Sequence, residues 1–303
     1  MNFVRGFFTG VFSSILTAVL IALGALITVN HTLLNPDFVI AELDKFDAYS
    51  IATDQLRSQL PREEPYMAEI VNETITELEP WVKEQAPAVI YAGYAYLKGE
   101  EELHIIIPLE EVRTCLKENV RQAVGESPPP ELEGASPSEI EAYLAEVYTM
   151  IDDQIPSQIE ITEAYLTSLS PEAAAQVQQA RQIVGYIETG YKWSIVAAIL
   201  LVLLIALVQW WHIKPITRYV GVPAITAGVV SLVGALLPRV AGAFVLQKIP
   251  LEIPPEVKAN LPQLFSDFTM PLRIYGIVLL AVGIGLVVLS VKLKPPPGEE
   301  TSR

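Results

Sequence analysis

The sequence predicts an all-α membrane protein with four transmembrane helices and one mostly helical domain outside the membrane, inserted between the first and second of these helices. Two observations support this fold class. Apolar residues make up 51% of the chain and gather in four runs, each close to the ~20 residues that a helix needs to cross ~30 Å of hydrocarbon. Residues 30–192, between the first two runs, carry 30 acidic and 10 basic side chains, which favours a domain in water.

The first span is predicted at residues 6–29, so that residues 1–29 hold the N-terminus and this helix. Small side chains recur in it at every fourth position, a pattern that lets another helix approach closely. We expect this ridge to pack within one bundle of four helices, and contact between two copies of the chain is the alternative. The ridge consists of Gly6, Gly10, Ser14, Ala18 and Ala22.

A cleavable signal peptide is the other interpretation of this first span. Arg5 precedes the apolar run, and Ala22-Leu23-Gly24 could serve as a weak cleavage site. The run is about 23 residues long, however, whereas the apolar region of a signal peptide has 7 to 15 residues. The length therefore favours a helix that is retained as an anchor.

The acidic domain, residues 30–192, is predicted to consist mainly of helices. Proline and apolar spacing indicate helices that begin at Pro36, near residue 64, at Pro80 and at Pro108. After a proline-rich break at residues 125–137, Ser138 and Glu141 match a capping box for a further helix. Two short segments rich in β-branched residues, 103–107 and 158–162, predict a small two-stranded β element.

The second span, at residues 193–211, is expected to continue a helix that begins in the acidic domain. Ser170-Pro171-Glu172 is typical of a helix start, and no break signal follows before the apolar run. An unbroken helix here would couple the domain rigidly to the membrane.

The last third of the chain is predicted to hold a cytoplasmic link (212–218), the third span (219–245), a proline-rich outer loop (246–271), the fourth span (272–291) and a disordered cytoplasmic tail (292–303). Gly228 and Ser231 in the third span and Gly283 in the fourth extend the set of helix-packing residues. In the outer loop, apolar side chains at helical spacing should dock under the acidic domain or, alternatively, lie on the membrane surface. These side chains are Leu261, Leu264, Phe265 and Phe268.

Basic residues give the orientation. Arg5, the 212–218 link and Lys292 would all lie on the same side of the membrane, and an excess of Lys and Arg marks the cytoplasmic side. The prediction is therefore a multi-pass protein of the plasma membrane with both termini cytoplasmic and the acidic domain outside. Arg239 and Arg273 fall near the outer boundary, where we expect them to extend towards water; charges at the outer mouth of a pore are the alternative.

The sequence predicts no catalytic, cofactor-binding or metal-binding residues, and hence no cofactor. His104 stands beside acidic residues, but no metal-ligand or nucleophile spacing surrounds it, and the acidic runs lack the loop pattern of a calcium site. Cys115 is the only cysteine, which excludes an intramolecular disulfide and predicts a buried small side chain or, alternatively, an intermolecular bridge. The negative charge of the domain excludes nucleic acid as a partner.

These observations predict a protein that is not an enzyme. It would contact the lipid bilayer, and its acidic domain would bind a protein partner or a second copy of the chain. The first alternative is a subunit of an oligomeric channel. The layout of four spans with a long first outer loop is similar to that of pannexins and connexins, although those families pair several outer-loop cysteines and this chain has one. The second alternative, an extracytoplasmic hydrolase, requires His104 and carboxylates to converge.

Overall fold

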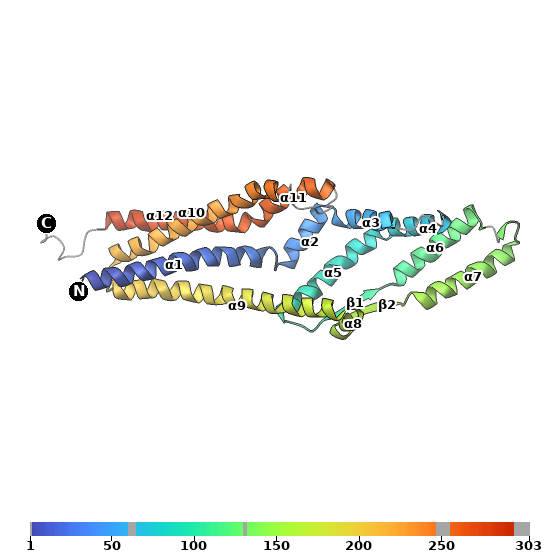
Figure 1. The fold of residues 1–303 in the computed structure, drawn as a ribbon, viewed down its shortest axis with the longest axis horizontal. Helices are drawn as coiled ribbons and strands as arrows, with labels where there is room; N and C mark the ends of the chain where they lie inside the picture. The colour runs from blue at the N-terminus through green and yellow to red at the C-terminus, as the bar shows by residue number, and fades with distance from the viewer. Residues whose placement is uncertain (1, 60–64, 130–131, 247–254, 294–303) are drawn as a thin grey trace. The chain divides into compact units, whose positions relative to one another are not determined.

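The computed structural model describes residues 2–59, 65–129, 132–246 and 255–293, with side chains at 5–57, 69–129, 132–237 and 260–293. Contacts between residues divide it into a membrane unit, residues 1–38 and 183–303, and an acidic unit, Val39–Gln182. The elements, labelled in Figure 1, are α1 (Asn2–His31), α2 (Pro36–Lys45), α3 (Ala48–Gln59), α4 (Pro65–Glu77), α5 (Glu79–Lys98), β1 (His104–Pro108), α6 (Glu110–Glu126), α7 (Pro137–Gln154), β2 (Gln158–Thr162), α8 (Glu163–Leu169), α9 (Pro171–Val208), α10 (Ile213–Leu246), α11 (Pro255–Phe268) and α12 (Met270–Lys292).

The mostly helical character of the chain and its four candidate spans are confirmed. Within the described part of the chain, four helices are long and apolar enough to cross a membrane: Arg5–His31, Pro171–Val208, Ile213–Leu237 and Met270–Lys292. Most of their large apolar side chains are exposed in the single chain, as in Ile199 and Val282. Lipid is the solvent that such a surface requires.

In the membrane unit, α10 and α12 lie side by side and α1 contacts both (Figure 1). Side chains on α1 donate hydrogen bonds to its neighbours and to its own backbone; between helices, Ser13 Oγ donates to the carbonyl of Tyr219 on α10 at 3.0 Å. The Tyr275 hydroxyl of α12 donates to the carbonyl of Leu20 at 2.8 Å. Helix α9 joins through an apolar cluster in which Leu16 of α1 meets Leu201 and Ile205.

Three chain segments meet at one end of the membrane unit. The start of α1 is tied to the end of α9, because Arg5 Nε donates to the Val208 carbonyl at 3.2 Å and Gln209 Nε2 donates to Thr9 Oγ1 at 2.9 Å. The end of α12 is tied to the start of α10 by the 2.9 Å hydrogen bond from Ser290 Oγ to the Lys214 carbonyl. These contacts gather the segments that the sequence analysis placed together on the cytoplasmic side.

The connection between α9 and α10 is shorter than the link predicted at residues 212–218. Helix α9 ends at Val208 and α10 begins at Ile213, so only four residues form the turn. Lys214 and Arg218 therefore lie in the first turns of α10 rather than in a loop. Pro215 causes no break there, because the first turn of a helix has no use for its missing N–H.

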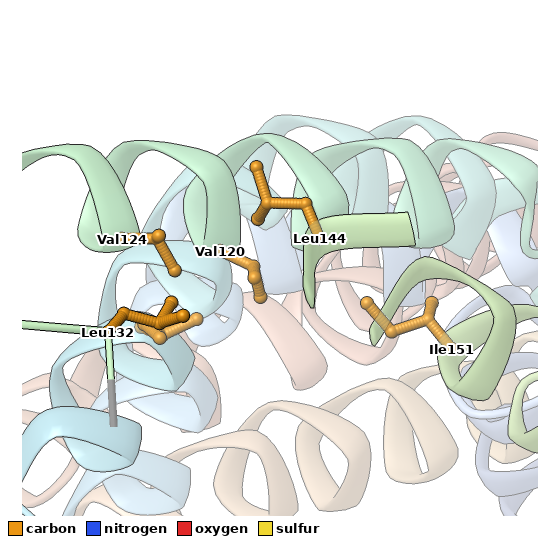
Figure 2. Close-up of a cluster of buried hydrophobic side chains, with 6 residues drawn as sticks. Val120, Val124, Leu132, Leu144 and Ile151 are labelled. Atoms are coloured by element: carbon orange, nitrogen blue, oxygen red, sulfur yellow. The ribbon is translucent and has the colours of Figure 1, made fainter. Parts of the chain in front are cut away.

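The acidic unit contains two separate apolar clusters. In the first, α4, α6 and α7 meet around side chains that are less than a tenth exposed (Figure 2). They are Ile70, Val120, Val124, Leu132, Leu144 and Ile151. In the second cluster, Tyr96 of α5 packs with Leu103, with Ile105 of β1 and with the less buried Val177 of α9. This cluster therefore includes the first part of the helix that continues into the membrane unit.

Strands β1 and β2 pair in an antiparallel two-stranded sheet, with Ile105 opposite Ile161 and Ile107 opposite Ile159. All four isoleucines lie on one face of the sheet. Ile105, Ile107 and Ile161 belong to the second cluster, and Ile159 is half-buried. Alternation puts Ile106 on the other face, where it is 48% exposed. Helix α8 follows β2 directly and is capped by Thr162, whose Oγ1 accepts the Tyr165 N–H at 3.2 Å.

The capping box of α7 is formed by Ser136 and Glu139, and the predicted pair of Ser138 and Glu141 is wrong. The Glu139 carboxylate accepts the Ser136 N–H at 2.7 Å and the Ser136 hydroxyl at 2.8 Å. Both pairs fit the same spacing rule. Pro137 decides between them, because its fixed φ suits the first helical position and makes the preceding residue the cap.

Helix α9 runs without a break from Pro171 to Val208, the continuity that the helix start at residues 170–172 predicted. Buried and half-buried positions recur along it every three or four residues, from Ala174 and Val177 to Leu201 and Ile205. One stripe on a single helix thus serves the core of the acidic unit and then the core of the membrane unit.

Candidate functional site

Two pairs of glycines bring α10 and α12 of the membrane unit into close backbone contact. Gly228 of α10 faces Gly276 of α12, and Gly221 faces Gly283. A Cβ placed on Gly228 would lie 2.8 Å from the Gly276 carbonyl oxygen, and one on Gly283 would lie 2.8 Å from that of Gly221. Real Cβ atoms do not approach an oxygen so closely, so the helices can adopt this separation only with glycine at these positions.

The structure thus places two of the predicted packing residues, Gly228 and Gly283, at this crossing. Ser231 is also buried, at 3% exposure, and its hydroxyl has no hydrogen-bond partner within the described chain. Gly276 belongs to the small residues that the sequence places in the fourth span, whereas Gly221 was not among the predicted packing residues. A signal was present, since the glycines of each helix are seven residues apart, which is two helical turns and returns to the same face.

The ridge of small residues on α1 lies outside the bundle of the single chain. Gly6, Ser14, Ala18 and Ala22 are exposed, and a Cβ on Gly6 or Gly10 would meet nothing within 4 Å. Steps of four residues advance about 40° around a helix with 3.6 residues per turn, so five such positions wind around it and cannot share one face.

The buried face of α1 follows a different line. Thr9, Leu16 and Leu23 are spaced by seven and are at most 9% exposed. Gly24 belongs to the same face, because a Cβ there would lie 2.8 Å from the Tyr275 ring. Hydrogen bonds and ring contacts therefore select the packing face of α1, and small size alone does not.

Arg239 and Arg273 are the two arginines predicted near the outer boundary. Arg239 lies in α10, but its side chain is outside the described residues. Arg273 is half-buried at the start of α12, and its Nη2 donates to Thr269 Oγ1 at 3.1 Å. This hydrogen bond ties Arg273 to the residue that caps its own helix, while its buried Nε has no partner among the described residues.

His104 and the acidic runs lie on the surface of the acidic unit. His104 is exposed at the first position of β1, opposite Thr162. Where the structure describes the chain, no group of three or more His, Cys, Asp or Glu side chains could hold a metal ion. Carboxylates of the acidic runs, such as those of Glu101 and Asp153, are exposed.

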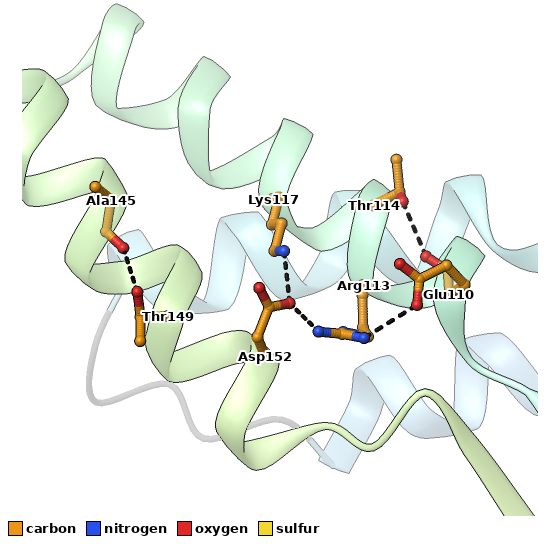
Figure 3. Close-up of polar contacts among 7 residues, drawn as sticks. All are labelled: Glu110, Arg113, Thr114, Lys117, Ala145, Thr149 and Asp152. Carbon is orange, nitrogen blue, oxygen red and sulfur yellow. Dashed lines mark hydrogen bonds and ion pairs between the residues drawn. The ribbon is translucent and has the colours of Figure 1, made fainter.

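Asp152 is the best-connected carboxylate of these runs. Its Oδ1 accepts from Arg113 and Lys117 of α6 and so ties α7 to α6, while Arg113 Nη1 also pairs with Glu110 at 3.0 Å (Figure 3). The hydrogen bond from Lys117 and the charge of Arg113 lower the pKa of Asp152. This network joins two helices of one core, which is a structural task.

A polar cluster closes the second core of the acidic unit. Tyr96 is 2% exposed, and its hydroxyl donates to Glu163 Oε1 at 2.6 Å. The guanidinium of Arg181 on α9 lies 4.6 Å from the centroid of the Tyr96 ring, and its Nη1 is 3.6 Å from Glu163 Oε1. Gly99 ends α5 in the left-handed region (φ 73°) beside this arginine. The cluster thus joins α5 and α8 to α9.

Cys115 is half-buried on α6 and is not positioned as a reactive thiol. Its Sγ donates to Glu77 Oε2 at 3.3 Å, and Asn119 Nδ2 donates to the same carboxylate oxygen at 3.1 Å. Burial, together with the Glu77 carboxylate, raises the pKa of Cys115 to about 12. The thiol therefore stays protonated at neutral pH, whereas the thiolate is the reactive form.

We expect iodoacetamide to alkylate Cys115 of the folded protein at pH 8 at least about tenfold more slowly than the same cysteine in denaturant, because the thiolate fraction is so low. Mass spectrometry of the quenched reaction gives both rates. Replacing Glu77 with Gln removes the charge and should speed the folded-state reaction. Equal rates in the folded and denatured chain would contradict the assigned environment.

Comparison of the chain with family models, with curated proteins and with solved structures finds no match.

Proposed function

We propose that this chain is a multi-pass membrane protein that acts by binding, with its acidic unit as the binding module for a protein partner or for a second copy of the chain. The observation that carries the proposal is an exposed apolar pair on α8. Tyr165 and Leu169 are one turn apart, 38% and 66% exposed, and belong to a unit whose composition favours water. A bound protein surface would remove this apolar area from water.

Helix α8 packs against the first part of α9. Its inner side chain, Leu166, packs in the cluster that holds Val177 of α9, and Glu163 at its first position pairs with Arg181 of α9. Helix α9 continues into the membrane unit. A partner on α8 would thus contact the element that packs against the first part of α9 within the acidic unit.

We further propose that the protein lies in the plasma membrane with both termini cytoplasmic and the acidic unit outside. The support is the charge distribution. Arg5, Lys214 and Lys292 lie near one end of the membrane unit, where α1 begins and α12 ends, and Lys and Arg concentrate on the cytoplasmic side of membrane proteins.

No specific observation among the described residues favours the channel subunit or the hydrolase. The glycine pairs bring α10 and α12 of a single chain into contact, which is packing within one chain. His104 is separate from any cluster of ligand-type side chains in the described residues. Ion flux into vesicles that hold the purified protein tests the channel directly, and voltage-dependent or tension-dependent conductance would revive it.

Photo-crosslinking in intact cells tests the binding proposal. A benzophenone side chain at position 165 or 169 of the full chain should give a discrete adduct of higher mass, and mass spectrometry of the adduct separates a partner from a second copy. Position 178 is the control, because Gln178 is exposed on α9 and polar. No adduct at 165 or 169, or the same adducts at all three positions, would refute binding at α8.

A further inference from the structure

The end of the membrane unit where α1 begins carries the strongest concentration of positive charge in that unit. We call this the basic end, and it combines basic side chains from three chain segments with two exposed indole rings. Its members are Arg5, Trp210, Trp211, His212, Lys214, Arg218 and Lys292.

No acidic side chain of the described membrane unit balances this charge. The three that occur there are Asp37, Glu188 and Asp267. Glu188 lies twenty residues before the end of α9, about 30 Å along the helix. Asp37 follows the far end of α1, and Asp267 precedes the far end of α12. Among the side chains described in the membrane unit, no carboxylate therefore competes at the basic end, and an external anion can occupy it.

The turn at this end keeps two tryptophans where glycine is the usual residue. Trp210 and Trp211 have φ values of 51° and 58°, in the left-handed region that is unfavourable for large side chains. Two hydrogen bonds end the helix here, from Trp210 N to the Leu207 carbonyl and from Trp211 N to the Ala206 carbonyl, both at 3.0 Å. In this helix-ending pattern glycine normally occupies the position that Trp210 has here.

These strained positions hold both indoles outward, at 69% and 67% exposure. The Arg5 guanidinium lies 6.0 Å from the centroid of the Trp210 ring. Tryptophan favours the boundary between hydrocarbon and headgroups, with its ring in the apolar layer and its N–H towards water. Two exposed indoles beside basic side chains are thus typical of a segment at that boundary.

From this combination we infer that the basic end binds the phosphate headgroups of anionic phospholipids. Arg218 and Lys292 are exposed and supply the charges, while Trp210 and Trp211 sit against the acyl chains of the same lipids. The inference is independent of the binding proposed for α8. It also gives a physical reason for the two tryptophans in the left-handed region. Contact between the indoles and lipid would offset the conformational strain that glycine at these positions would avoid.

Quenching of tryptophan by brominated lipids tests the inference. The full-length protein with Trp81→Phe and Trp193→Phe retains Trp210 and Trp211 as its only tryptophans, because the chain has four, and excitation at a wavelength that tyrosine does not absorb isolates their emission. In vesicles, dibrominated phosphatidylglycerol should displace phosphatidylcholine from these rings with a relative binding constant of about 3 or more, given that each basic residue near the surface favours anionic lipid several-fold. The preference should weaken as salt rises.

The charge-removing variant Arg218→Gln with Lys292→Gln should lower the relative constant to about 1. The matched control, Lys98→Gln with Arg121→Gln in the acidic unit, removes the same charge and should leave it unchanged. Inorganic phosphate at constant ionic strength should not reduce the preference. Equal quenching by the two lipids in the parent protein, a preference that survives loss of Arg218 and Lys292, or competition by free phosphate would each overturn the inference.

Discussion

Replacing Gly228 or Gly283 with Ala should destabilise the membrane unit more than replacing any other described glycine of its helices with Ala. Each new Cβ would lie 2.8 Å from a carbonyl oxygen of the facing helix, and backbone cannot move aside as a side chain does. The two helices must separate, which loosens the contacts along their whole length. Overpacking of this kind costs about 1–3 kcal/mol, enough to lower the thermal midpoint by several degrees.

The measurement is the loss of helical circular dichroism on heating the purified full-length protein in a mild detergent. Two neighbouring glycines are matched controls. A Cβ on Gly285 of α12 would meet nothing within 4 Å, and one on Gly234 of α10 would make only an ordinary contact at 3.8 Å with Leu272. Gly285→Ala and Gly234→Ala should melt at or above the parent midpoint, because alanine also favours the helix. Midpoints that do not separate the two groups would contradict the packing of α10 on α12.

Truncation of Tyr96 to Ala should cost the acidic unit about 3–5 kcal/mol, the range for removing a buried aromatic ring. The ring fills the second core, and the variant also removes the partner of the Glu163 carboxylate and the surface on which Arg181 lies. Because total stabilities are about 5–15 kcal/mol, this loss should open α5 and the first part of α9 to solvent.

Hydrogen exchange followed by mass spectrometry checks this expectation peptide by peptide. Tyr96→Ala should accelerate exchange in α5, α8 and the start of α9 and leave the α10–α12 pair unchanged. Tyr96→Phe keeps the ring and loses one hydrogen bond, so it should cost only about 1 kcal/mol. Truncation of the more exposed Tyr165 should have little effect. Parent-like exchange in Tyr96→Ala would show that the polar cluster does not hold α9 to the acidic unit.

Much of the fold could be predicted because its signals are local. The apolar runs define four spans by length alone, and the helix start at Pro171 needs only its own neighbours. Segments 103–107 and 158–162 are short and β-branched, and the structure has strands at His104–Pro108 and Gln158–Thr162. Local signals fail when two of them overlap, as with the capping boxes at Ser136 and Ser138.

Helix-to-helix contacts were harder to predict, because they depend on faces rather than on composition. The small residues of α1 were predicted to form its packing face, yet Thr9 and Leu16 are the buried residues. Their contacts with Gln209 and Leu201 explain this burial, and those contacts are known only from the structure. Tyr96, Glu163 and Arg181 are 67 and 18 residues apart in the chain. No spacing rule connects such residues, so the cluster could be found only in three dimensions.

The proposed topology is tested most directly by labelling cysteines from one side of the membrane. In a Cys115→Ser background, Glu172→Cys places a thiol on the exposed start of α9 in the acidic unit, and His212→Cys places one in the exposed turn at the basic end. An impermeant maleimide added to intact cells stripped of any outer envelope should label position 172 at once and position 212 only after the membrane is permeabilised. Equal labelling of both positions in intact cells would contradict the proposal that the four helices cross the membrane with the acidic unit outside.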